Sequence, residues 1–201
     1  MIPGMKLEIL TALCTFAFVS SVTPGPNNLM LMTSGANFGV WRSLPHFFGV
    51  VFGFALMIIL VGTGLVQVFE AYPVSYQILR ICSIVYLSYL AWKIAVAKPQ
   101  SVESRAKPLT SLQAALFQWV NPKAWAIALT AVTVYAPSQS LAAIGLIALI
   151  CGVINMPSVF IWVLLGSKMQ RLLSSGVRLK VFNYSMALLL LATLYPTIMK
   201  Q

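Results

Sequence analysis

The chain has 201 residues, of which 60% are hydrophobic and only 8% are charged. Soluble domains carry roughly a quarter charged residues, so this composition excludes a soluble protein and indicates an all-α membrane protein. The formal net charge of +10 comes from 13 Lys and Arg against 3 acidic residues; we interpret the basic residues as anchors of membrane loops, and we expect no nucleic-acid partner.

Charge-free apolar runs predict six transmembrane helices. A span needs roughly 20 apolar residues, so the run Ile9–Trp41 is too long for one span, and Ala124–Ser167 is two spans with a turn at Ala136-Pro137-Ser138. Helices are expected rather than a barrel because the runs are continuously apolar and do not alternate with period two. The predicted spans are roughly 8–33, 44–66, 77–96, 112–134, 139–165 and 181–199.

The first span is interrupted by Thr23-Pro24-Gly25-Pro26-Asn27-Asn28. A proline removes a backbone donor and frees carbonyl groups where no water can satisfy them. The helix that restarts after Pro26 presents unpaired N–H groups, equivalent to about half a positive charge, and Asn27 and Asn28 are predicted to cap it. We therefore expect a pocket inside the membrane that suits a carboxylate.

The second span carries glycines and the only histidine of the chain. Gly49 and Gly53, with Gly35 and Gly39 before them, form two small-xxx-small patterns that indicate close helix packing; direct contact with a substrate is the alternative. His46 is either a structural residue near the membrane interface or a proton relay.

A polar linker, 98–111, divides the chain into two halves, 1–97 and 112–201, each with three spans. Because three is odd, related halves must face opposite ways, which is the inverted-repeat architecture of many secondary transporters. The second half opens with its own break at Asn121-Pro122-Lys123. Helix breakers at corresponding places in two halves point to a transporter binding site. The alternative is that each proline merely kinks a packed helix.

Lys123 lies at the midpoint of its predicted span, where a lysine costs about 2.5 to 3.5 kcal/mol on insertion scales. Glu8, Glu70 and Glu103 are near span ends or in a loop, so no carboxylate is predicted to neutralise it. An unpaired cation inside a membrane is a functional candidate; the alternative is that Lys123 reaches the interface.

These features predict a site for a zwitterion. Lys123 and the helix end at Asn27 are expected to receive its carboxylate, while freed carbonyls around Pro24 and Pro122 receive its ammonium. A further motif, Asn155-Met156-Pro157, is predicted to break the fifth span, and in one interpretation it lines the path. The candidate substrate-binding residues are Pro24, Gly25, Pro26, Asn27, Asn28, Asn121, Pro122, Lys123 and Asn155.

Basic residues are distributed unevenly between the predicted loops. Three lie on one side, namely Lys6, Arg80 and Lys200. Nine lie in or beside the first, third and fifth loops: Arg42, Lys93, Lys98, Arg105, Lys107, Lys168, Arg171, Arg178 and Lys180. The positive-inside rule therefore puts the odd loops in the cytoplasm and both termini outside.

The segments "TPGPNNLMLMTSGANFGVWRSLPHFFGVVFGF", "YLSYLAWKIA" and "FQWVNPKAW" resemble the LysE/RhtB superfamily of amino-acid exporters, over essentially the whole chain. TPGPNN looks most like the branch that exports cysteine and O-acetylserine. The resemblance implies a proton-driven exporter of small amino acids or derivatives, of the cysteine/O-acetylserine or homoserine/threonine type, in the inner membrane. Its two signatures fall on Pro24 to Asn27 and on Asn121 to Lys123. The chain departs at Pro45, where a small residue is expected, which bears on helix packing.

Three other functions are alternatives to export by alternating access. An enzyme needs converging carboxylates, histidines or thiols, and these are scattered. A membrane thiol-electron carrier needs a pairing cysteine in each half, whereas Cys14, Cys82 and Cys151 fall singly in three spans. A heavy-metal cation exporter needs metal ligands in the span, where Lys123 would repel the ion. We expect no cofactor and no bound metal; the expected partners are a small amino acid and the bilayer, with a homodimer left open.

Proton coupling has two possible sources in the sequence. Because no acidic residue is predicted within a span, either Lys123 titrates during transport or the substrate itself carries the charge.

Overall fold

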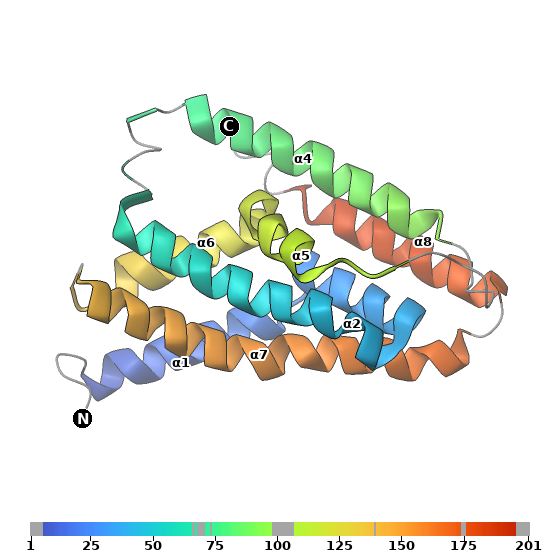
Figure 1. Ribbon diagram of the computed structural model, residues 1–201, viewed down its shortest axis with the longest axis horizontal. Coiled ribbons are helices and arrows are strands. Elements are labelled where there is room, and N and C mark those ends of the chain that lie inside the picture. Colours follow the sequence, from blue (N-terminus) through green and yellow to red (C-terminus); the bar gives the residue numbers. More distant parts are fainter. Residues whose placement is uncertain are drawn as a thin grey trace.

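The computed structural model describes residues 6–65, 67, 71–72, 74–97, 107–138, 140–173 and 176–195. Within these residues all regular structure is helical, which confirms the all-α prediction. The elements are α1 (Leu7–Val22), α2 (Pro26–Leu60), the π-helical turn η1 (Val61–Leu65), α4 (Val74–Ala95), α5 (Ser111–Phe117), the 3₁₀ turn η2 (Gln118–Val120), α6 (Pro122–Tyr135), α7 (Leu141–Leu172) and α8 (Gly176–Ala192). Figure 1 shows most of them running along one common axis.

The chain reverses within the predicted connection between the first two spans, 34–43, but it does so by a sharp turn at one residue and not by a loop. Helix α2 is interrupted only at Gly39, whose φ of 76° and ψ of 176° are non-helical and favour glycine. The hydroxyls of Ser34 and Ser43 are 2.8 Å apart, although residues nine apart in a straight helix are separated by about 13.5 Å. The chain therefore folds back at Gly39, and α2 consists of two arms. The first arm, 26–38, and the second arm, 40–60, lie side by side (Figure 1).

Close helix packing at the predicted glycines is confirmed at three of the four positions. A Cβ added to Gly35 would lie 2.2 Å from the carbonyl oxygen of Val163 on α7, and Cβ atoms at Gly49 and Gly53 would lie 2.3 to 2.5 Å from the α5 backbone. Only glycine permits these approaches. Pro45, the departure from the family pattern, does not disturb them: its carbonyl oxygen accepts a 2.8 Å hydrogen bond from Ser111 Oγ.

Two further boundaries need correction. Helix α7 continues through Pro157, so the predicted break of the fifth span is wrong; a proline inside a membrane helix is tolerated where neighbouring helices accommodate the freed groups. Helix α8 begins at Gly176, before the predicted 181, and the end of the sixth predicted span lies outside the described residues. The predicted turn at Ala136-Pro137-Ser138 does separate α6 from α7.

Two large hydrophobic clusters hold the bundle together. The first joins α1, the second arm of α2, α6 and the start of α7, through residues such as Leu13, Met57 and Ala128. The second joins the first arm of α2 to α4, α5 and α8, through residues such as Leu29 and Leu87. Both clusters contain helices from both predicted halves, so the described parts of the two halves form one packed body.

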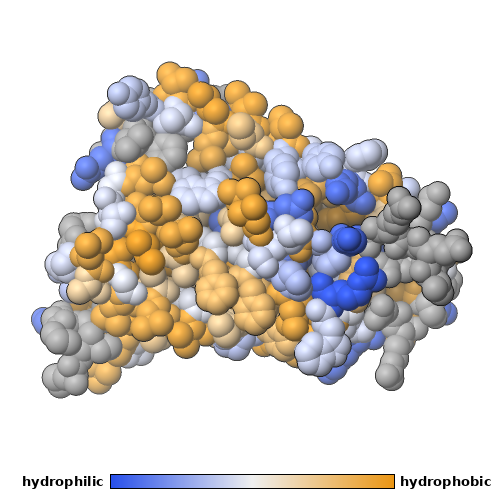
Figure 2. Space-filling view, in the orientation of Figure 1, coloured by the Kyte–Doolittle hydropathy of each residue, from blue (hydrophilic) through white to orange (hydrophobic). Residues whose placement is uncertain are grey.

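The composition of the surface is that of a membrane protein. Large apolar side chains are exposed along α4 and α8, among them Ile81, Val85 and Leu188. Figure 2 shows apolar residues over much of one face, most densely toward the left of the view. Within the described residues, three stretches are long and apolar enough to cross a bilayer: Pro26–Leu65, which folds back at Gly39, Gln77–Ala95 and Leu141–Met169. Helix α1 is apolar but shorter. The arrangement of six spans in two repeats stays a prediction.

Exposed basic residues gather toward one end of the bundle. Figure 1 brings together there the Gly39 turn, the end of α4, the end of α7 and the start of α8, and Figure 2 shows the densest hydrophilic surface at the same end. The exposed residues in question are Arg42, Lys93, Lys107, Lys168, Arg178 and Lys180. Two of the predicted loop anchors, Lys98 and Arg105, lie with the linker residues 98–106 outside the part that the structure describes.

Candidate functional site

The chain leaves helical geometry at the first predicted break. Helix α1 ends at Val22, Thr23 is extended (φ −64°, ψ 141°), Gly25 is extended, and α2 begins with Pro26 as its first residue. Pro24 disfavours helical backbone at Thr23, and Pro26 suits the first helical position because the N–H it lacks would have no partner there. The sequence thus ends one helix and starts another in the middle of the bundle.

The predicted capping of α2 by Asn27 and Asn28 is wrong. No side chain caps this end. Asn28, which is buried, instead donates its Nδ2 hydrogens to the carbonyl oxygens of Ser21 and Thr23, each at 2.8 Å. These carbonyls end α1 and have no helical partner, and a buried acceptor without a partner costs about 1 to 3 kcal/mol. Asn28 therefore closes the preceding helix, because its side chain turns back toward the freed carbonyls.

The second break is shorter. The 3₁₀ turn η2 ends at Val120, Asn121 is extended (φ −96°, ψ 102°), and Pro122 is the first residue of α6. The Oδ1 atom of Asn121 accepts hydrogen bonds from the backbone N–H groups of Lys123 (3.2 Å) and Ala124 (3.4 Å). This asparagine is the N-cap that its residue type favours.

The two breaks meet through a pair of amides. Asn27 Nδ2 donates to Gln118 Oε1 at 2.9 Å, and Gln118 Nε2 donates to Asn27 Oδ1 at 3.2 Å. Gln118 is fully buried and also donates to the carbonyl of Ala114. Sequence reasoning missed Gln118, although a glutamine four residues before Pro122 in an apolar span is a polar side chain that needs partners.

Lys123 is not unpaired, which corrects the prediction. Its ammonium donates to the carbonyl oxygen of Thr23 (2.7 Å), to Thr23 Oγ1 (2.8 Å) and to the carbonyl oxygen of Pro24 (3.4 Å). The side chain crosses over Gly25, where an added Cβ would lie 2.6 Å from Lys123 Cδ. A lysine from the second break therefore fills the carbonyl site of the first, where the sequence predicted the ammonium of a substrate.

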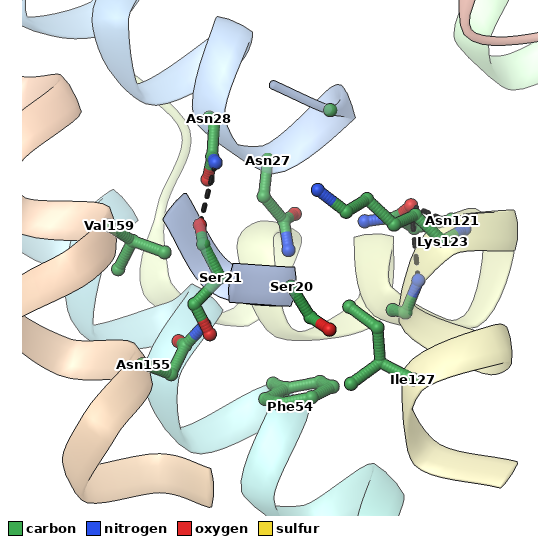
Figure 3. A pocket seen from close by; sticks show the side chains of 12 residues that line it. Ser20, Ser21, Asn27, Asn28, Phe54, Asn121, Lys123, Ile127, Asn155 and Val159 are labelled. Atoms are coloured by element: carbon green, nitrogen blue, oxygen red, sulfur yellow. Dashed lines mark hydrogen bonds between the residues drawn. The ribbon is translucent and has the colours of Figure 1, made fainter. Parts of the chain in front are cut away.

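Around these contacts lies a small pocket (Figure 3). It is lined by Ser20, Ser21, Gly25, Asn27, Asn28, Phe54, Asn121, Lys123, Ala124, Ile127, Asn155 and Val159. Its volume of about 20 Å³ holds one or two water molecules and is too small for an amino acid. The pocket is closed to a substrate in this conformation.

One polar atom of the pocket lacks a partner within the described part of the chain. Asn155, close to the middle of α7, donates to Ser21 Oγ at 3.1 Å, but its Oδ1 accepts no hydrogen bond and is buried. Buried polar atoms are nearly always paired. An unsatisfied acceptor at the wall of a closed polar pocket is what a site awaiting a ligand or water would show.

Most predicted site residues come together here. Gly25, Asn27, Asn28, Asn121, Lys123 and Asn155 line the pocket. The three prolines do not line it: Pro26 and Pro122 start the two helices, and Pro24 is exposed with its carbonyl directed at Lys123. Besides Gln118, sequence reasoning missed the two serines at the end of α1 and the apolar wall of Phe54, Ile127 and Val159, because nothing local distinguishes them from packing residues.

His46 does not take part in this site. It is 2% exposed, lies in the second arm of α2, and neither ring nitrogen has a hydrogen-bond partner among the described residues. The side chain is therefore buried inside the protein, and both its position near the membrane interface and its proton-relay role stay predictions.

Comparison with known proteins finds one family and several relatives that cover nearly the whole chain. The LysE type translocator family matches residues 18–193. The cysteine/O-acetylserine efflux protein of Escherichia coli K12 is 27% identical over 188 residues, which cover 92% of this chain and 95% of that protein. Proteins of the same name from E. coli O139:H28 (26% identical; 93% and 96% covered) and Shigella flexneri (27%; 90% and 93%) are similar.

No solved structure matches the chain. The family match extends from the end of α1, through both breaks, into α8. Translocators are transport proteins, so the family that this chain matches is a family of transporters. This protein belongs to the LysE family of translocators.

Proposed function

We propose that this protein exports small neutral amino acids or their derivatives, of the cysteine and O-acetylserine type, by alternating access. The relatives that carry the name of cysteine/O-acetylserine efflux proteins cover nearly the whole chain, which supports this substrate class over the homoserine/threonine alternative. The substrate binds where the two helix breaks meet, and the two halves rock against each other around it. Its carboxylate is received by Lys123 and by the start of α2.

The observation that carries the proposal is the contact between the breaks. Residues about a hundred positions apart join them: Asn27 with Gln118, and Lys123 with Thr23. Together they surround a polar pocket within an apolar bundle. Among the described residues, the backbone N–H groups of Asn27 and Asn28 have no partner at the start of α2, so the site offers donors to an anion. The closed pocket then corresponds to an occluded state.

Matching positions at the two breaks support inverted halves. Pro26 and Pro122 are both the first residues of a helix. The next residues, Asn27 and Lys123, both reach across to the other break. The helix contacts show the same correspondence between the halves. Helix α1 of the first half contacts α7 of the second, and α5 of the second half contacts α2 of the first. These pairings are what two related three-helix units facing opposite ways would produce.

The basic end of the bundle supports an orientation. Arg42 follows the Gly39 turn, Lys168 is near the end of α7 and Arg178 is near the start of α8, which lie at one end of the bundle (Figure 1). Positive residues favour the cytoplasmic side. We place the odd loops in the cytoplasm of an inner-membrane protein and both termini outside. A reporter fused to the C-terminus that is active only in the cytoplasm would contradict this orientation.

Energy coupling to protons is part of the proposal. The described site contains no carboxylate, so the charge that moves belongs either to Lys123 or to the substrate. Export that is insensitive to an imposed pH gradient would remove proton coupling while leaving the binding site intact.

The test is accumulation of labelled cysteine, O-acetylserine and threonine inside everted membrane vesicles, where export is measured as uptake. Lys123→Ala and Asn27→Ala are each expected to lower the initial rate at least tenfold. Lys180→Ala is the matched control, since it removes an exposed lysine of α8 that does not line the pocket. Wild-type vesicles that accumulate none of the three, or equal rates in Lys123→Ala and Lys180→Ala, would contradict the proposal.

A further inference from the structure

The ammonium group of Lys123 has a full set of hydrogen-bond acceptors. Its Nζ has three N–H donors and three oxygen acceptors within reach, the carbonyl oxygens of Thr23 and Pro24 and the hydroxyl of Thr23. The hydroxyl hydrogen of Thr23 donates to the carbonyl of Ser20 at 3.1 Å, which turns the lone pairs of Oγ1 toward Lys123. We call these three oxygens the Thr23–Pro24 cradle.

The cradle attracts cations without containing a carboxylate. It stands at the C-terminal end of α1, where the helix dipole places partial negative charge. Since both carbonyls belong to residues outside helical geometry, no backbone N–H of α1 competes for them. Nothing in these three oxygens is specific for lysine as opposed to another primary ammonium group.

Lys123 also keeps the pocket closed. Its aliphatic stem lies across Gly25, and both residues line the cavity. The side chain is only partly buried, whereas Gly25 beneath it is buried. Withdrawal of the lysine from the cradle would remove a wall of the pocket and expose the same three oxygens.

We propose that the Thr23–Pro24 cradle is the subsite for the primary ammonium group of the substrate, and that Lys123 occupies it in the empty protein. On loading, the substrate ammonium replaces the Lys123 ammonium, and the displaced lysine pairs with the substrate carboxylate. The number of ammonium–oxygen contacts is preserved, so neither charge is left without partners in the membrane. The substrate part of this inference rests on the proposed function; the cradle itself does not.

Methylammonium tests the cradle directly on the purified full chain in detergent. In Lys123→Ala the cradle is vacant, so methylammonium chloride is expected to raise the Tm by several degrees, increasing with the logarithm of concentration above the Kd. In the wild type and in Lys180→Ala the cradle is filled, and the Tm should stay within one degree of its value in tetramethylammonium chloride, which controls for ionic strength and has no N–H donors. Adding Thr23→Val to Lys123→Ala removes one acceptor and should weaken the response.

Equal responses of wild type and Lys123→Ala to methylammonium, or no response in either, would overturn the cradle. If Lys123→Ala does not fold, the decisive measurement is made on wild-type vesicles: unlabelled O-acetylserine should compete with labelled substrate, and N-acetylserine, which lacks a primary ammonium, should not. Equal competition by both compounds would also overturn it. A methylammonium response without any amino-acid transport would keep the cradle and reject the proposed function, so the two failures are distinguishable.

Discussion

The break before α2 leaves Thr23 to Gly25 outside helical geometry, whereas the break before α6 leaves only Asn121. At the second break the local chain supplies its own partners, because Asn121 caps α6. At the first break the partners come from elsewhere: Asn28 returns from α2 and Lys123 reaches over from α6. The second break is therefore stabilised by its own residues. The first break is stabilised by side chains from other helices, and these side chains can move away.

This difference assigns different tasks to the two breaks. A capped helix start keeps its geometry when its surroundings change, so the second break suits a fixed support. The first break has carbonyl groups held by a long flexible lysine, which can exchange partners at little strain. The variants below test whether the first break is the more dependent of the two.

The largest effect is expected from the asparagines. Asn28→Ala leaves the carbonyl of Ser21 without a partner and removes one donor from that of Thr23, and should lower the free energy of unfolding by about 2 to 3 kcal/mol. Asn121→Ala removes only an N-cap and should lower it by about 1 kcal/mol. Thermal unfolding in detergent compares the two. Equal losses, or a larger loss for Asn121→Ala, would reverse the contrast between the breaks.

The next effect concerns the glycine beneath Lys123. In Gly25→Ala the new methyl group collides with Lys123 Cδ and moves the ammonium from its three oxygens, which should lower the free energy of unfolding by about 1 to 2 kcal/mol. Backbone strain does not contribute, since Gly25 is extended. Gly145→Ala in α7 is the matched control, because a Cβ there meets no atom within 4 Å. An unchanged Tm for Gly25→Ala would show that Lys123 is not held at the break.

The smallest effect is the coupling between the breaks. A double-mutant cycle of Asn27→Ala and Gln118→Ala should give a coupling energy of about 1 kcal/mol, as expected for side chains in direct contact. The cycle is measured by denaturant unfolding. Additive effects would mean that the reciprocal amide pair does not join the two breaks energetically.

The sequence predicted the breaks because prolines dictate them locally. Pro24, Pro26 and Pro122 forbid specific backbone hydrogen bonds wherever they occur, and both breaks appear at these residues. Asn155 could be predicted as a site residue for a related local reason, because it is an amide in an apolar run. Pro157 shows the limit of the argument, because neighbouring helices decide whether a membrane proline ends a helix or is tolerated.

What the sequence could not predict depends on contacts between distant residues. The partner of Lys123 lies about a hundred residues away at Thr23, so the lysine looked unpaired along the chain. The same holds for Gln118 and Asn27. The spans 8–33 and 44–66 imply a reversal of the chain between them, but the sequence did not show that Gly39 alone makes the turn. Gly39 also fits a packing motif, and only φ, which the sequence does not reveal, separates the two roles.

The position of the turn at Gly39 determines how deep the pocket lies along the broken helix formed by α1 and the first arm of α2. Helix α1, with 16 residues, is about 24 Å long, and the arm of α2 from Pro26 to Phe38 is about 20 Å long at 1.5 Å per residue. The pocket at the first break is thus nearly equidistant from the two ends of this broken helix. A molecule held there would face two walls of similar thickness, and a small tilt in either direction could thin one of them while thickening the other.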